Sequence, residues 1–386
     1  MVLINSFSDL TEFQDQIRAC ECSDGMTLYH YKSIDENSNP ILKQVRGLIF
    51  ENETGKLLMG GFPYTPEYTY DTPNLQAIFG GLDKYRITFS FEGTVVRVFY
   101  YKDKWRVATT KKLDARNSYW AMRNVSFEDL FRSAIDHTIQ NPNGILKHYM
   151  QQKGLNSFSY DTFFESLEKD RQYMFLIRPL GENRIVSFFD PTIPVLHVGT
   201  FINHSYTLDD YIGIPKPCEM PEIKSVEDLT TVVAGLDPYY AQGVLLIGEN
   251  TFFKVISKRY AYLYSLRGNE ANLEYRYLEV KKNDPNLLPD FLTLYPMCFG
   301  YNLTNIDIRL EKLAKIIFDS YMNRFVHKKY VVLPQCMFHF MVKVHHNFLK
   351  TKTQTTLETV QTMLKEEETK NVYNMLSQNF DSCFSM

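Results

Sequence analysis

The sequence has no segment that would direct it into or across a membrane. Its first residues, MVLINSFSDLTEF, lack the basic stretch followed by an apolar stretch that marks a secretory signal. No apolar run approaches the roughly 20 residues that a membrane-spanning helix requires. These absences argue against a membrane partner, and we expect a soluble protein of the cytoplasm.

Paired cysteines and an excess of positive charge are also missing. Cys20-x-Cys22 has no second cysteine pair at the spacing of a zinc site, so we expect reduced thiols and no metal site. The net charge is −3, which means that a nucleic-acid site would have to be a local basic patch. The cysteines are Cys20, Cys22, Cys218, Cys298, Cys336 and Cys383.

Aromatic residues, in contrast, are abundant. The chain contains 26 tyrosines and 28 phenylalanines, so it can build a substantial core. With 386 residues it is long enough for one large domain and one small domain, or for two of moderate size.

The stretch from 85 to 115 is the most informative part of the chain. Its pattern predicts three strands, at 87–89, 95–101 and 105–110. The polar hairpin Lys102-Asp103-Lys104 joins the last two. Glu92 and Gly93 lie between the first two, and an acid followed by a glycine allows the backbone to pass close to a bound ligand.

The N-terminal segment predicts a helix followed by strands. Leu10, Phe13 and Ile17 recur at helical spacing within residues 1–24, with Ser8 or Asp9 as the helix cap. Strands are expected at 26–31, 45–50 and 56–59, the last two forming a hairpin.

Helices are expected in the middle and at the end of the chain. Residues 118–170 are mostly helical by pattern, with a capping box at Ser126 and Asp129, and a further helix is expected at 225–234. From residue 290 the apolar residues recur at steps of three or four. They predict helices at about 306–325, 335–349, 357–367 and 371–378.

The segment around Glu92 resembles the core motif of covalent nucleotidyltransferases, the group of RNA ligases, DNA ligases and capping enzymes. That motif is Lys-x-Asp/Glu-Gly, and its lysine attacks the α-phosphate of a nucleoside triphosphate. Glu92 and Gly93 take the last two positions, and Ser90 stands at the position of the lysine. The resemblance therefore implies the fold together with the loss of the nucleophile.

Within that group, the chain is similar to the T-even phage RNA ligase 1 family over nearly its whole length. Arg46-Gly47 matches an Ala-Arg-Gly-x-x-Phe strand, and Phe62-Pro63 matches an aromatic segment whose following lysine is replaced by Tyr64. Residues 182–186, ENRIV, match a family segment with the same five residues in the same order. Residues 321–325 fit the Tyr-x-x-Arg-Phe of a C-terminal helical domain.

The same alignment locates the remaining motif positions. The glutamate that lies beside the ribose falls on Ile177, and the acid of the Glu-Gly-x-Val motif falls on Gln242. The final Lys-x-Lys motif keeps Lys254 and has Ile256 in place of its second lysine.

These replacements remove defined chemistry. The hydroxyl of Ser90 would need a neighbouring base, and no histidine lies near it in the sequence. Gln242 is a weaker ligand for a hard cation than a carboxylate is. Ile177 cannot accept a hydrogen bond from a ribose hydroxyl, and Ile256 removes a charge that would neutralise phosphate.

Three retained polar residues have two interpretations each. Arg46 contacts a phosphate or pairs with an acid at the edge of the core. Glu92 bonds a ribose or a base, or it caps its own turn. Lys254 lies in an apolar strand and needs either a ligand or a counter-charge, because a lone buried lysine is costly.

We therefore expect an α+β protein with two domains. An ATP-grasp-like nucleotidyltransferase (ligase) domain of mainly antiparallel sheets would occupy 1–285, and a small all-helical domain 290–386. We expect one cleft between two sheets, formed by Ser90, Glu92, Ile177, Gln242, Lys254 and Ile256. No residue is assigned a catalytic role. The vestigial nucleotide-binding residues would be Arg46, Glu92, Gly93, Arg97, Ile177, Gln242, Lys254 and Ile256.

The helical domain is predicted to carry a local basic patch. A surface that binds RNA or tRNA has such a composition, with aromatic residues between the cations, and a solvated helix face has it too. The cations are Arg324, Lys328, Lys329, Lys343 and Lys350, and the aromatic residues between them are Tyr330, Phe338 and Phe340.

Three functions are compatible with this sequence. The first is a catalytically inactive RNA ligase homologue, encoded by a virus or phage, that binds RNA, a nucleotide or a protein in the host cytoplasm or the virion. The second is an active ATP-dependent RNA ligase for RNA or tRNA repair, which would need ATP, Mg²⁺ and a lysine such as Lys84 from elsewhere in the chain. The third is a structural component of a virion or of its assembly.

Overall fold

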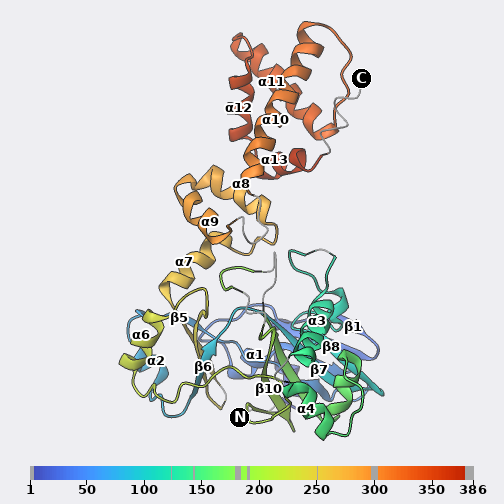
Figure 1. The fold of residues 1–386 in the computed structure, drawn as a ribbon, viewed down its shortest axis with the longest axis vertical. Helices are drawn as coiled ribbons and strands as arrows, with labels where there is room; N and C mark the ends of the chain where they lie inside the picture. Colours follow the sequence, from blue (N-terminus) through green and yellow to red (C-terminus); the bar gives the residue numbers. More distant parts are fainter. Residues whose placement is uncertain are drawn as a thin grey trace. The chain divides into compact units, whose positions relative to one another are not determined.

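The chain divides into two compact units, residues Met1–Tyr264 and Ser265–Met386. The structure is a computed structural model, and it describes residues 4–122, 124–141, 144–178, 184–188, 192–249, 251–296 and 303–378 (Figure 1). The division lies earlier than the boundary at 285–290 that the sequence suggested. The reason is that the segment after Ser265 packs with the C-terminal helices, as shown by the hydrogen bond from Asn272 Nδ2 to the Tyr373 hydroxyl at 2.6 Å.

The first unit begins with a four-stranded antiparallel sheet in the order β1-β2-β3-β4. The predicted hairpin at 45–59 and the strand at 26–31 are confirmed within it. Its strands are β1 (Ile17–Ser23), β2 (Met26–Tyr31), β3 (Arg46–Glu51) and β4 (Leu57–Met59).

The predicted helix over residues 1–24 is only partly correct. Residues Phe7–Gln16 form a 3₁₀ helix whose cap is Ser6, with Asp9 completing the capping box. Ile17 was expected on the helix but starts β1, because residues 17–23 pair with β2. Strand pairing with a distant segment has overridden the local helical spacing.

The second sheet has five strands in the order β11-β10-β9-β7-β8, and all its described pairings are antiparallel. Lys102 and Asp103 form the predicted hairpin with φ values of 47° and 56°, the conformation that a tight two-residue hairpin requires. The strands are β7 (Thr94–Tyr101), β8 (Lys104–Thr109), β9 (Arg171–Ile177), β10 (Val195–Ile202) and β11 (Ser205–Thr207).

The third sheet has four strands in the order β5-β13-β12-β6, and β5 runs parallel to β13. Its strands are β5 (Glu67–Thr69), β6 (Arg86–Ser90), β12 (Gly243–Ile247) and β13 (Phe252–Ile256). The consecutive strands β6 and β7 therefore belong to different sheets. The chain passes from one sheet to the other at residues 91–93, which places Glu92 at the crossing.

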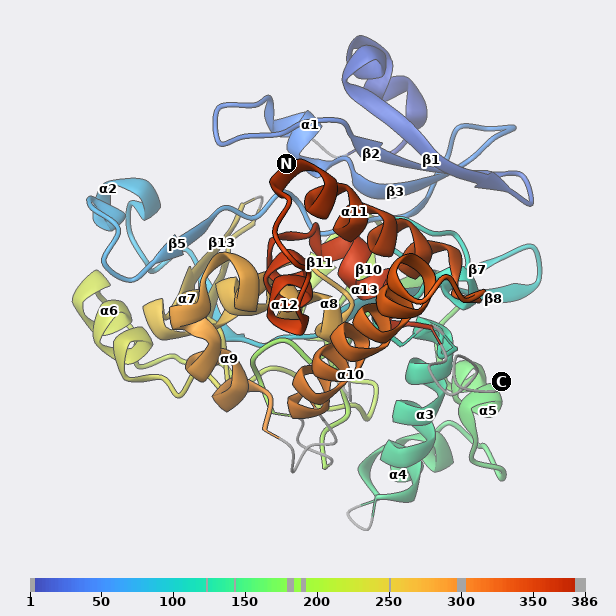
Figure 2. The same cartoon turned by 90° about the horizontal axis from the view of Figure 1, so that it is seen from above.

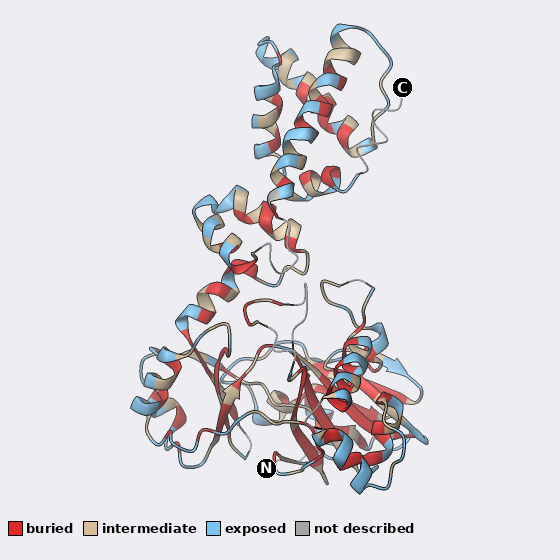
Figure 3. Ribbon diagram, viewed as in Figure 1, coloured by how far each residue is buried: buried red, intermediate tan, exposed pale blue. Residues whose placement is uncertain are grey.

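Helices cover these sheets. On the second sheet, α3 packs through Phe131, whose ring centroid lies 5.0 Å from that of Phe175. On the third sheet, α2 and α6 share a core with β12 and β13, and Figure 3 shows how the buried residues gather on strands and inner helix faces. The predicted capping box of Ser126 and Asp129 is confirmed. The helices of this unit are α1 (Pro40–Gln44), α2 (Leu75–Phe79), α3 (Phe127–Gln140), α4 (Ile145–Gln152), α5 (Tyr160–Phe163), α6 (Val226–Gly235) and α7 (Lys258–Arg267), the last of which runs three residues into the second unit.

The described residues of the second unit form helices and no strand. The four helices predicted after residue 290 are present, and α10 and α11 lie side by side (Figures 1 and 2). In the described part of the chain, no helix has the length and apolar character needed to span a membrane. The helices are α8 (Leu273–Asn283), α9 (Leu288–Leu294), α10 (Thr304–Tyr321), α11 (Gln335–Thr351), α12 (Leu357–Glu366) and α13 (Thr369–Leu376), with a π-helical turn at Met322–Val326.

A buried arginine joins the first sheet to the second. Arg97 of β7 is 1% exposed, and its guanidinium donates to the carbonyls of Gly47, Gly60 and Thr109. Burial, with a smaller contribution from Arg46, lowers the pKa of Arg97 to about 9. The side chain assigned to nucleotide binding from the sequence thus ends on backbone carbonyls inside the protein.

Replacing Arg97 is therefore expected to destabilise the fold. Arg97→Met keeps the length of the side chain but leaves buried carbonyls without donors, and it should lower the free energy of unfolding by about 3 kcal/mol. Urea denaturation measures this. Arg116→Met is the matched control, because the Arg116 side chain is 70% exposed and its ion pairs should contribute little. Equal stability of the two variants would contradict the structural role of Arg97.

Candidate functional site

Ser90 and Gln242 meet at the edge of the third sheet. Ser90 is the last residue of β6, and Gln242 directly precedes β12. The Gln242 amide donates to the Ser90 carbonyl at 2.9 Å, and the Ser90 hydroxyl donates to Gln242 Oε1 at 3.3 Å. Both residues are buried. Ser90, which the resemblance aligns with the nucleophile, is thus held by Gln242, which it aligns with an acid that would help to hold a metal.

The carboxylate of Glu92 is engaged by backbone groups. Glu92 is 4% exposed, and its oxygens accept from the backbone N–H groups of Ile185 at 2.6 Å, Val186 at 2.8 Å and Ser187 at 3.0 Å. Three backbone donors are enough to satisfy a buried carboxylate. Rather than capping its own turn, Glu92 thus fixes a segment that lies more than 90 residues away in the sequence.

Tyr260 joins Glu92 to Gln242. Its hydroxyl accepts from Gln242 Nε2 at 2.9 Å and donates to Glu92 Oε2 at 3.2 Å. Burial, together with the charge of Glu92, raises the pKa of Tyr260 far above its usual value, so that the hydroxyl keeps its proton. Ser90, Gln242, Tyr260 and Glu92 therefore form one hydrogen-bonded chain, called the Glu92 network below.

Ile177 lies on the other side of Glu92. It is the last residue of β9 and pairs with Thr94 of β7. A Cβ added to Gly93 would lie 2.3 Å from the Ile177 carbonyl oxygen, so the close approach of the two strands requires glycine here.

A small cavity remains beside Glu92. Its volume is about 120 Å³, whereas pockets for small-molecule ligands usually measure about 300–1,000 Å³. A nucleoside triphosphate does not fit in it as it stands. The residues that line it are Glu92, Gly93, Thr94, Trp120, Leu130, Ile177, Arg178 and Ile185.

Ile256 and Lys254 lie on the same face of the third sheet as Ser90. The strand register aligns Ser90, Gly243 and Ile256 in one row across β6, β12 and β13. Lys254 lies two residues before Ile256 and hence on the same face. The opposite face, with Val244 and Val255, belongs to the core under α2 and α6.

Lys254 has a counter-charge within the protein. Its ammonium lies 2.8 Å from a carboxylate oxygen of Glu67 on the neighbouring strand β5. Of the two partners that the sequence left open, a ligand or a counter-charge, the structure contains the second.

Of the six residues expected around one cleft, only Glu92 and Ile177 line the cavity beside Glu92. Ser90, Glu92 and Gln242 share the Glu92 network, Ile177 lines the cavity beside it, and Ile256 and Lys254 extend along the sheet face. That cavity includes neither Ser90 nor Lys254. Glu182 and Asn183 of the ENRIV segment lie outside the described residues.

Arg46 lies apart from this network, in the first sheet. Its guanidinium is 3.5 Å from the Pro63 carbonyl. This contact involves neither a phosphate nor an acid. Arg46 and Arg97 therefore both end on backbone carbonyls.

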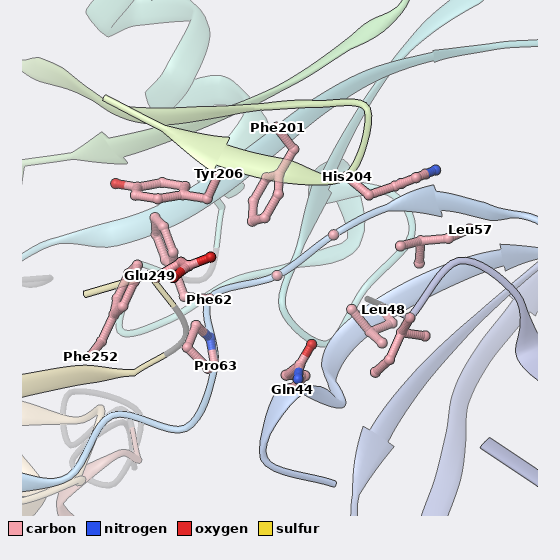
Figure 4. Close-up of a pocket in the computed structure, with 13 residues that line it drawn as sticks. Gln44, Leu48, Leu57, Phe62, Pro63, Phe201, His204, Tyr206, Glu249 and Phe252 are labelled. Atoms are coloured by element: carbon pink, nitrogen blue, oxygen red, sulfur yellow. The ribbon is translucent and has the colours of Figure 1, made fainter. Parts of the chain in front are cut away.

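A second cavity lies where Phe62 and Pro63 pass between the sheets (Figure 4). It has a volume of only about 50 Å³ and is largely apolar. The ring of Phe62 lies 5.5 Å from that of Tyr206 and 5.6 Å from that of Phe252. The aromatic segment matched from the sequence therefore serves packing.

Lys84 lines a different and larger cavity, of about 660 Å³. It lies in the turn before β6, whereas Ser90 ends that strand, and the strand from Arg86 to Ser90 alone spans roughly 13 Å. Arg86 in the same cavity pairs with Asp209 at 2.8 Å. Lys84 is therefore remote from the Glu92 network.

Two parts of the site had little signal in the sequence. The backbone donors at 185–187 cannot be recognised, because any residue supplies an N–H. Tyr260 lay in a segment that matched a strand motif, but Lys258 begins α7, which turns the Tyr260 hydroxyl toward Glu92. A tyrosine shortly after the last strand was the only available hint.

The basic residues of the second unit are only partly free. The Lys343 ammonium pairs with Glu367 at 2.9 Å, and the Arg324 guanidinium lies over the ring of Phe338 at 4.9 Å. Lys328, Lys329 and Lys350 are exposed and form no ion pair with the described residues. The patch expected from the sequence therefore consists mainly of these three lysines and Arg324.

No protein-family model matches the chain. Its curated relatives are viral immediate-early proteins. The ICP-46 homologue of Invertebrate iridescent virus 3 is 28% identical over 364 residues, which are 89% of this chain and 74% of the relative. The homologue of Invertebrate iridescent virus 6 is 26% identical and covers 79% and 67%. ICP-46 of Frog virus 3 (isolate Goorha) is 24% identical and covers 51% and 50%.

The solved structures that are similar include ATP-dependent ligases. An archaeal ATP-dependent RNA ligase matches with a TM-score of 0.39 and 14% identity, over 77% of this chain and 71% of that one. A DNA ligase candidate of Aquifex aeolicus has a TM-score of 0.35 and 11% identity, over 90% and 87%. An RNA ligase of Naegleria gruberi has a TM-score of 0.30 and 13% identity, over 54% and 60%. The chain is thus similar in sequence to viral immediate-early proteins.

Proposed function

We propose that this chain is a catalytically inactive, virus-encoded relative of the T-even phage RNA ligase 1 family that binds RNA. The observation that carries the proposal is the Glu92 network. Three motif positions deduced separately from the sequence, Ser90, Glu92 and Gln242, lie together, which supports a common origin with the ligases. Their side chains bond to one another, which supports the loss of catalysis.

The geometry around Ser90 disfavours nucleophilic attack. Its hydroxyl donates to an amide oxygen, and an amide cannot act as the base that a serine nucleophile needs. The cavity nearby is too small for a triphosphate. Nucleotidyl transfer at this position would require both a new base and an opened site.

Electrostatic support for a triphosphate is also weak. Glu92 uses its oxygens on backbone donors and Tyr260, which leaves it poorly placed to hold a divalent ion. Lys254 is paired with Glu67. Phosphoryl transfer depends mainly on positioned charges, so these pairings argue against activity as strongly as the missing lysine does.

RNA is the ligand that the remaining surface favours. The small cavity speaks against a nucleotide, and Lys328, Lys329 and Lys350 are exposed and form no ion pair with the described residues. An active ligase remains the second candidate, but Lys84 lines a different cavity from the one beside Glu92. A structural role in a virion would leave the basic surface without a ligand.

The absence of catalysis can be tested by covalent labelling with ATP. We expect no labelled protein from the natural chain in the presence of Mg²⁺, and none from Ser90→Lys, because an amine alone does not restore the ribose, metal and phosphate contacts. Ser90→Lys combined with Ile177→Glu, Gln242→Glu and Ile256→Lys should label weakly at most. Labelling of the natural chain would refute the proposal, and strong labelling of the single variant would show that only the nucleophile is missing.

The Glu92 network should contribute to stability. Tyr260→Phe removes one donor and one acceptor between buried groups and should lower the free energy of unfolding by about 1–2 kcal/mol. Glu92→Gln turns an amide group toward backbone donors and should cost about 3 kcal/mol. Urea denaturation measures both, with Tyr211→Phe as the control because Tyr211 is 59% exposed.

A structural role and a ligand-binding role of Glu92 predict opposite changes in the free energy of unfolding of Glu92→Gln. Residues kept for a ligand are often strained, and their replacement commonly leaves stability unchanged or raises it. A Glu92→Gln protein as stable as the natural chain, or more stable, would indicate a working site.

RNA binding should depend steeply on salt. Anisotropy of a labelled single-stranded RNA measures the binding constant at several salt concentrations. In the double variant Lys329→Glu with Lys350→Glu, the slope of the logarithm of the binding constant against the logarithm of the salt concentration should fall in magnitude by about 1.4. Each lost phosphate contact should account for about 0.7 of this change. Lys365→Glu with Lys370→Glu makes the same change of charge on exposed lysines of α12 and α13 and should have a smaller effect. RNA affinity that does not change with salt concentration, or an equal loss of affinity in both double variants, would contradict a phosphate-binding patch.

A further inference from the structure

The basic patch predicted in the second unit lies in a segment without acids. From Ser320 to Leu357 the sequence contains no aspartate or glutamate, although the whole chain has a net charge of −3. The segment spans the last turn of α10, the connection to α11, α11 itself and the start of α12. Its cations are Arg324, Lys328, Lys329, Lys343, Lys350 and Lys352.

The connection between α10 and α11 exposes apolar side chains beside these cations. Tyr330 is 85% exposed, more than any other large hydrophobic residue in the described part of the chain. Val326 and Val332 on either side of it are 52% and 57% exposed. Lys328 and Lys329 directly precede Tyr330 and are exposed as well. A tyrosine in this setting presents both ring faces to solvent next to positive charge.

Hydrogen bonds hold the first residues of this connection in place. The backbone N–H of His327 donates to the Met322 carbonyl at 2.9 Å, and that of Lys329 donates to the Asn323 carbonyl at 2.8 Å. Lys328 adopts a left-handed φ of 56° between them, and its ammonium donates to the Phe325 carbonyl at 2.9 Å. The residues just before Tyr330 are thus tied to the π-helical turn.

Stacked aromatic rings pack the π-helical turn against α11. The Phe325 and His345 rings lie 3.8 Å apart at an interplanar angle of 9°, and His345 in turn stacks against Phe348 at 6.0 Å. This packing connects the turn to the middle of α11. The exposed Tyr330 therefore follows a segment whose position is fixed by these contacts.

We propose that this connection binds single-stranded RNA, with Tyr330 stacking on a base and Lys328 and Lys329 contacting the adjacent phosphates. The inference rests on the proposed RNA-binding function and specifies its site and its ligand. A free aromatic face accepts any unpaired base, and cations beside it match the charge of the backbone. A duplex covers its base faces and would leave Tyr330 without a partner. Lys328 retains further donors after its bond to Phe325, because an ammonium has three.

The test uses the full chain and a fluorescein-labelled oligouridine of about 16 nucleotides, the upper end of the usual single-strand site size. Anisotropy titrations compare the natural chain, Tyr330→Ala and Tyr330→Phe. We expect Tyr330→Ala to weaken binding about tenfold or more, as loss of a base–aromatic stack does, and Tyr330→Phe to stay within about twofold because the ring remains. Tyr211→Ala controls for the loss of an exposed tyrosine elsewhere and should bind like the natural chain.

A hairpin duplex of the same nucleotide number supplies the second arm. The natural chain should bind it more weakly than the single strand, and Tyr330→Ala should change duplex binding little. If Tyr330→Ala binds the single strand as well as the natural chain does, or if the duplex is preferred, the inference is wrong while RNA binding itself stands. If the natural chain binds neither RNA, both the inference and the RNA-binding part of the proposed function are wrong. Circular dichroism melting of each variant checks that the fold is kept.

Discussion

The buried carboxylate of Glu92 is the interaction on which the centre of the first unit depends. A charge removed from water is costly unless hydrogen bonds replace its solvation, and here three backbone N–H groups and the Tyr260 hydroxyl do so. Those donors come from residues 185–187 and from α7, and Glu92 itself lies where the chain changes sheets. One side chain thus fixes three segments that are distant in the sequence.

The loss of catalysis that we propose agrees with the way in which the side chains around Glu92 are satisfied within the protein. Ser90 and Gln242 are neutral side chains that bond to each other, so their burial requires no counter-charge. Ile177 and Ile256 add buried apolar surface at positions where a ligase would have polar groups. In the function that we propose, these replacements convert a site that needs a ligand into one that is satisfied by the protein, and RNA binding is assigned to the exposed cations and Tyr330 of the second unit.

Local patterns predicted most elements well, and tertiary pairing explains where they did not. The hairpin at Lys102-Asp103 and the cap of α3 depend on neighbouring residues and were correct. The separation of β6 from β7 was not predictable, because two strands joined by a short turn have the same pattern whether they pair together or enter different sheets. Ile17 joined a strand rather than a helix because β2 offered hydrogen-bond partners. Lys254 was recognised as needing a partner, but that the partner is Glu67 followed only from the parallel pairing of β5 with β13.

By itself the sequence determined which chemical groups are present: a hydroxyl at Ser90, hydrocarbon at Ile177 and Ile256, an amide at Gln242, and a segment without acids around Tyr330. These identities limit the chemistry whatever the fold. The tertiary structure alone decided what each group contacts, above all that Glu92 meets the N–H groups of 185–187. Backbone donors are the same at every residue and leave no trace in a sequence, so only the path of the chain through space could reveal that the acid has a partner of its own.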